Sequence, residues 1–145
     1  MTAAAAFLLG CPGKLEDPER FTGAINPADG GTQKFACDSG KDPYKDIIVQ
    51  NCQAACHNAA GAPSFGKLDL TEEGLATRLV GVESASDLCA GKPLIPSDGS
   101  EGLFIEKVKA DAPSCGTRMP TTARLSEEDI TCLEQYAASL AEAQQ

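Results

Sequence analysis

Tryptophan is absent from this 145-residue chain, which has only two tyrosines, five phenylalanines, two methionines and one histidine. Large side chains that could fill a core are therefore few, although 145 residues are enough for one domain. The single histidine, together with scattered cysteines, disfavours a zinc site, which needs three or four ligands. It also leaves no second histidine for a peroxidase-like base. No glycine-rich phosphate loop or nucleophile–base pair is present, so the sequence does not indicate an enzyme.

A long apolar run is also missing. Residues 3–10 form a short apolar stretch that cannot span a bilayer, so we expect no transmembrane span. Cys11 follows Leu8-Leu9-Gly10, as at the end of a bacterial lipoprotein signal, but the basic segment that begins such signals is absent. A translation start upstream of Met1 would explain that absence. Residues 1–11 are thus either a lipobox-like segment, with a lipid anchor at Cys11, or a short signal fragment or disordered tail.

Charge and cysteine content narrow the cellular setting. The net charge of −9 disfavours nucleic acid as a partner and suits a protein that is steered toward basic docking surfaces. Seven cysteines are many for a chain of this length and favour an oxidising compartment. We therefore expect a periplasmic or cell-surface protein.

The most informative motif is Cys52-Gln53-Ala54-Ala55-Cys56-His57, which contains the only histidine. Two thiols that attach to porphyrin vinyl groups, followed by an imidazole on the iron, define a c-type haem site. The usual spacing is C-x-x-C-H, and the extra residue here would be accommodated as a small loop. One haem c held by Cys52, Cys56 and His57 would supply the apolar bulk that the composition lacks. A local disulfide beside a surface histidine is the alternative interpretation.

The chain divides into the segment 1–11, an irregular extension or tether over 12–40, and a domain over 41–145. The extension is rich in Gly, Pro, Asp and Thr, and within it Phe21, Phe35 and Cys37 are the residues expected to dock.

Helices separated by irregular loops are expected in the domain, without strands. Each helix follows a capping residue: Pro43 into Cys52 after Asp42, Glu72 to about Val80 after Thr71, Glu101 to about Lys109 after Ser100, and a terminal helix after Ser126. The apolar stripe of the last helix is Ile130, Leu133, Ala137 and Leu140. This pattern predicts a small all-α domain with long loops.

Met119 is the one methionine besides Met1, and Pro120 follows it in a loop ahead of the terminal helix. A thioether is a weak iron ligand that raises the reduction potential, and it needs a rigid loop, which Pro120 favours. Taken alone, a loop methionine is more often a core residue. Together with the motif at Cys52 to His57, Met119 is the candidate distal ligand.

Helix, Cys…Cys-His, loops, Gly116-Thr117-Arg118-Met119-Pro120 and an amphipathic terminal helix resemble a monohaem c-type cytochrome of class I. The segments Cys115 to Met119 and Leu125 to Ile130 are similar to haem domains of exported proteins and lipoproteins from myxobacteria and related bacteria. The resemblance covers about residues 42–143. It implies a cytochrome c-like helical fold, a proximal His57, a distal Met119, and electron transfer with redox partner proteins.

In such a fold the first and last helices cross, and this arrangement guides the pairing of the remaining cysteines. With Cys11 assigned to lipid and two cysteines to haem, four are left. We predict Cys37–Cys132 and Cys89–Cys115, with Cys37–Cys89 and Cys115–Cys132 as the alternative.

Two functions from different classes remain. The first is electron transfer by a covalently bound c-type haem. The second is a haem-free, disulfide-stabilised surface interaction domain with the same shape. A haem sensor, in which Met119 leaves the iron open, is a third.

Overall fold

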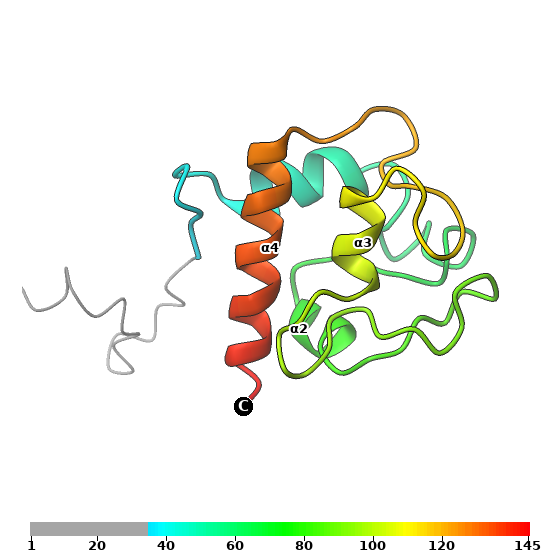
Figure 1. The fold of residues 1–145 in the computed structure, drawn as a ribbon. Coiled ribbons are helices and arrows are strands. Elements are labelled where there is room, and N and C mark those ends of the chain that lie inside the picture. The colour runs from blue at the N-terminus through cyan, green and yellow to red at the C-terminus, as the bar shows by residue number, and fades with distance from the viewer. Residues whose placement is uncertain (1–34) are drawn as a thin grey trace, which may run out of the picture. The chain divides into compact units, whose positions relative to one another are not determined.

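The protein is represented by a computed structural model that describes residues 35–145, and Figure 1 shows its fold. The helices in this range are η1 (Pro43–Gln53), α2 (Leu75–Leu79), α3 (Leu103–Lys109) and α4 (Glu127–Glu142). Two isolated bridges, Val80 with Ile95 and Glu83 with Pro93, occur in the described part, and no strand is formed there. The expected helical architecture without strands is confirmed at this level. Cys11 and Phe21 lie outside the described residues.

Helix η1 begins where the sequence indicates. The Asp42 carboxylate accepts the backbone N–H groups of Tyr44 and Lys45, each at 3.1 Å, and Pro43 occupies the first helical position. The type of helix was not predicted. Helix η1 is a π-helix, with i→i+5 hydrogen bonds such as the one from Ala54 N–H to Val49 O at 3.2 Å. Cys52 lies in its last turn, as expected.

The terminal helix is also confirmed. The Ser126 hydroxyl accepts the Asp129 N–H at 3.1 Å, so α4 starts directly after its predicted cap. Of the predicted stripe, Ile130, Leu133 and Ala137 are buried and Leu140 is partly buried. Helix α4 packs against both α3 and η1, and η1 runs across its N-terminal part (Figure 1).

The predicted start of the second helix was wrong. Thr71 does not cap α2, which begins at Leu75, because its hydroxyl instead accepts from Arg78 Nη2 at 3.1 Å.

The start of the third helix was also misplaced. The Ser100 hydroxyl donates to Asp98 Oδ1 at 2.7 Å, and α3 begins at Leu103 after Gly102. Helix α3 ends at Lys109, as predicted, and its side chains Leu103, Phe104 and Val108 are buried.

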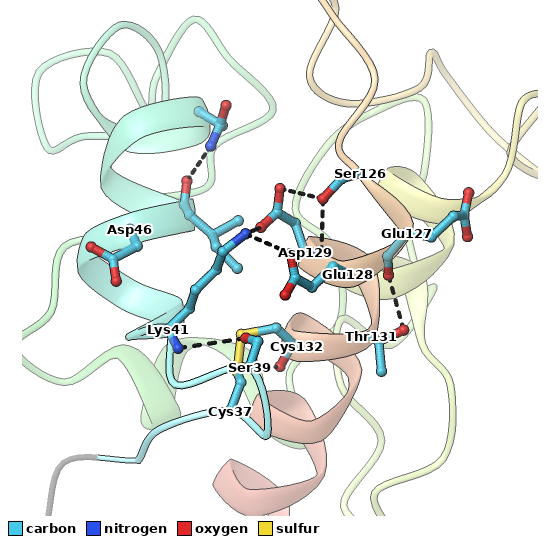
Figure 2. A network of polar contacts seen from close by, with 12 residues as sticks. Cys37, Ser39, Lys41, Asp46, Ser126, Glu127, Glu128, Asp129, Thr131 and Cys132 are labelled. Carbon is cyan, nitrogen blue, oxygen red and sulfur yellow. Dashed lines mark hydrogen bonds and ion pairs between the residues drawn. A yellow bond between two sulfur atoms is a disulfide. The ribbon is translucent and has the colours of Figure 1, made fainter.

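Two disulfides form within the described residues, Cys37–Cys132 and Cys89–Cys115, and the predicted pairing is confirmed. Figure 2 shows the first of them beside an ion-pair network in which Lys41 Nζ contacts Asp129 at 2.7 Å and Glu128 at 3.2 Å. Burial raises the pKa of Asp129, but hydrogen bonds from Lys41 and Ser126 outweigh it and hold that pKa below its usual value. The segment before η1 is therefore fastened covalently and electrostatically to α4.

Core side chains from all four helices meet in one cluster, with Ile47, Ile48, Leu79, Ile95 and Leu133 almost fully buried. The loops that follow η1, α2 and α3 gather on the side of α3 that faces away from α4 (Figure 1). No helix of the described residues is long and apolar enough to cross a membrane. The helices supply most of the core, and the loops between them lie together on one side of α3, where a site can form.

Candidate functional site

A cavity of about 650 Å³ lies among these loops, and most of its wall surface is apolar. Three of the four predicted site residues, Cys52, His57 and Met119, line it, although Met119 lies far from the other two in sequence. Helix α3 contributes Leu103, Phe104, Lys107 and Val108 to the wall. Cys56 is not part of the wall. The fold therefore brings most of the predicted ligand set around one hollow.

His57 is oriented by the loop that follows it. Its Nδ1 lies 3.1 Å from the backbone carbonyl oxygen of Leu68. Because a carbonyl oxygen can only accept, this hydrogen bond requires the proton on Nδ1. The neutral ring then has its lone pair on Nε2, the arrangement that metal-binding histidines use. A second bond, Leu70 N–H to His57 O at 2.8 Å, fixes the backbone on which the ring is carried.

The extra residue of the motif is accommodated by the same wide winding that characterises η1. His57 N–H donates to Cys52 O at 3.0 Å, which closes an i→i+5 turn around the four intervening residues. Ala54 and Ala55 are exposed on this turn. The chain then folds back closely, since a Cβ on Gly61 would lie 2.2 Å from Cys56 O. One additional residue thus widens a helical turn and leaves both cysteines next to His57.

Cys52 and Cys56 are the two described cysteines that form no disulfide. Burial, with a smaller contribution from nearby Cys56, raises the pKa of Cys52 to about 11. At neutral pH Cys52 is therefore a protonated thiol, which reacts slowly with disulfides because the thiolate is the nucleophile. Both Cys52 and Cys56 are unpaired, whereas the other described cysteines form disulfides.

Met119 is held to α3 and, through the disulfide, to a second wall segment. Its N–H donates to Lys107 O at 2.7 Å. Four residues earlier, Cys115 is joined to Cys89, which itself lines the cavity. The loop therefore has little freedom to withdraw Met119 from the wall.

Two basic residues in the site were not predicted. Arg78 donates to the carbonyls of Asp69 at 3.0 Å and Glu73 at 2.7 Å, and so fixes the turn after Leu68. Lys107 donates to the carbonyls of Cys115 and Thr117 and fixes the loop before Met119. No sequence motif marks either residue, because their partners, apart from the Thr71 hydroxyl, are backbone carbonyls, which every residue has.

Apolar side chains also lie on the wall where it meets solvent. Phe65 and Leu88 are the exposed large hydrophobic residues of the described part, at 45% and 76% exposure, and both line the cavity. Beside Met119, Arg118 Nη1 is buried and has no hydrogen-bond partner within residues 35–145.

Residues 35–145 contain no cluster of three or more histidine, cysteine, aspartate or glutamate side chains that could hold a metal ion. The candidate metal-ligating atoms are instead one imidazole nitrogen and one thioether sulfur on a shared cavity. Comparison with family models, with curated proteins and with solved structures finds no match to this chain.

Proposed function

We propose that this protein is a monohaem c-type cytochrome that transfers single electrons. The observation that carries the proposal is that His57 and Met119 line the same apolar cavity, next to two cysteines left out of the disulfides. In this proposal Cys52 and Cys56 bind the haem covalently, His57 is the proximal ligand and Met119 the distal ligand. The helices around the cavity are then those of a cytochrome c-like domain.

The residues present fit a haem in size, polarity and donor type. The cavity volume of about 650 Å³ falls within the roughly 300–1,000 Å³ that small-molecule sites occupy. An imidazole and a thioether are the axial pair of electron-transferring haem proteins. The Arg118 Nη1 atom is a buried donor without a partner among the described residues, but Arg118 does not line the cavity and is given no role in this proposal.

The chain's own residues have separable tasks in this proposal. When bound, haem supplies an iron couple that accepts and releases one electron. His57 is kept in the Nδ1–H form by Leu68 O and so presents Nε2 as a ligand. The Met119 sulfur would hold the iron on its other side and would favour the ferrous form, which raises the potential. Leu103, Phe104 and Val108 of α3 would give a bound haem an apolar contact surface.

Location and partners follow from charge and disulfides. Structural disulfides are typical of exported proteins, and we propose a periplasmic or cell-surface position, with a lipid anchor at Cys11 if the N-terminal segment is a lipoprotein signal. The net charge of −9 favours a redox partner with a basic docking surface, and that association should weaken as salt is added.

Covalent haem is the first expected result. The exported full chain should be coloured, should show a sharp ferrous α-band after dithionite, and should keep its colour on the polypeptide through acid–acetone extraction. The matched variant, Cys52→Ala with Cys56→Ala, should lose all of its colour to the solvent, because no thioether can form. A colourless exported chain, or one whose wild-type colour is extracted, would contradict the proposal and favour the haem-free surface domain.

A second expected result concerns the spacing of the motif. Deleting Ala55 shortens the turn, so that His57 N–H can reach Cys52 O in an ordinary i→i+4 helical bond, and the only side chain removed is an exposed methyl. We expect covalent haem content, measured by the extraction assay, to stay at the wild-type level. Inserting one more alanine after Ala55 should abolish haem attachment. The bond from the histidine N–H to Cys52 O would then have to be i→i+6, which no regular helix forms. Loss of haem in the deletion variant would show that the i→i+5 turn is itself required.

A further inference from the structure

Lys107 binds the loop ahead of Met119 through both its side chain and its backbone. Its ammonium donates to the carbonyl oxygens of Cys115 and Thr117, the second at 3.0 Å. Its own carbonyl oxygen accepts the Met119 N–H at 2.7 Å. A single residue of α3 therefore fixes the loop at alternate residues from 115 to 119.

The loop backbone is shaped to receive this ammonium. Gly116 lies between the two accepting carbonyls and has a φ of +58°, in the left-handed region that favours glycine. A Cβ at this position would also lie 2.8 Å from Lys107 Nζ, too close for an ordinary contact. Gly116 thus permits both the bend that turns two carbonyls toward one cation and the approach of that cation.

The neighbouring residue of α3 fixes the beginning of the same loop. The Glu106 carboxylate accepts both the backbone N–H and the hydroxyl of Ser114, the latter at 2.9 Å. Charged donors and acceptors make the stronger hydrogen bonds. Adjacent charges of opposite sign on one helix thus bind successive parts of the loop, and Lys107 binds the part nearest Met119.

We propose that Lys107 is the positioning residue that holds the Met119 side chain at the cavity wall. Lys107 itself lines that wall, in the turn of α3 next to buried Phe104 and Val108. The inference rests on the proposed function in one respect only, namely that the Met119 sulfur binds haem iron. That Lys107 orders the segment from 115 to 119 follows from the contacts alone.

The test compares Lys107→Met with Lys109→Met in the full chain. Methionine keeps the apolar stem of the lysine and removes the ammonium. Lys109 has the same charge on the same helix but pairs with Glu101 and Glu134, away from the loop. Hydrogen exchange should be at least roughly tenfold faster over residues 115–119 in Lys107→Met, because both charged hydrogen bonds of the ammonium, to the carbonyls of Cys115 and Thr117, are lost. In Lys109→Met it should be unchanged.

A second measurement reports whether the Met119 sulfur still binds the iron. In haem-loaded chain, Lys107→Leu, which removes the ammonium without adding a second thioether to the cavity wall, should lose most of the weak far-red ferric band of methionine ligation, whereas Lys109→Leu should retain it. Gly116→Ala, which pushes against Lys107 Nζ, should reproduce both effects. Unchanged exchange in Lys107→Met overturns the inference, and so does faster exchange with an intact band. If the wild-type chain carries no haem, the proposed function fails, and the exchange rates still decide whether Lys107 orders the loop.

Discussion

Replacing Met119 with alanine is expected to lower the reduction potential of the haem-loaded protein by on the order of 0.1 V, within the roughly 0.8 V that axial ligation spans. The thioether stabilises ferrous iron more than ferric iron, so its loss favours the oxidised form. The weak far-red ferric band should disappear at the same time. Potentiometric titration followed by visible absorption measures both effects in one experiment.

Thr122→Ala is the matched control for Met119→Ala. Thr122 is exposed, lies three residues further along the same loop and does not line the cavity. Its replacement should leave the potential and the band unchanged. If Met119→Ala leaves the potential and the band unchanged, as Thr122→Ala should, then another side chain is the distal ligand. The potential of the proposed electron carrier would then be set by that side chain.

Removing the Cys37–Cys132 disulfide, by replacing both cysteines with alanine, is expected to cost about 4.7 kcal/mol in free energy of unfolding. The bond spans 95 residues in sequence, and the entropy lost by the unfolded chain grows with the length of the closed loop. By the same relation, the Cys89–Cys115 bond, with a separation of 26, contributes about 3.5 kcal/mol. Urea denaturation of the two double variants should rank them in this order.

Lys41→Met tests the ion pairs that also join the segment before η1 to α4. It removes the ion pairs with Asp129 and Glu128 that lie beside the Cys37–Cys132 bond and leaves the bond in place (Figure 2). The Lys41–Glu128 pair is exposed and the Lys41–Asp129 pair is partly buried at the surface; such surface pairs contribute little, so the variant should unfold close to the wild-type urea concentration. A loss in Lys41→Met as large as that of the disulfide variant would mean that the network, and not the covalent bond, fastens the segment to α4.

Most of the helical framework could be predicted from sequence because its determinants are local. Asp42 and Ser126 cap their helices by accepting N–H groups two or three residues further on, and such pairs can be read directly from the chain. Thr71 and Ser100 have the same chemistry but are not caps in the folded protein. Their hydroxyls find Arg78 and Asp98 instead, and a sequence does not show which of two polar partners prevails.

In the candidate site, too, some features could be read from the sequence and others only from the structure. Cys52, Cys56 and His57 are neighbours in sequence, and Met119 is conspicuous because methionine is so rare here, so the sequence by itself determined which residues to consider. Only the tertiary structure decided that His57 and Met119 share a cavity, that Leu68 O orients the imidazole, and that Lys107 holds the loop. The physical reason is that these last contacts end on backbone carbonyls. Every residue carries that acceptor, so no side-chain pattern records which one the folded chain brings within reach.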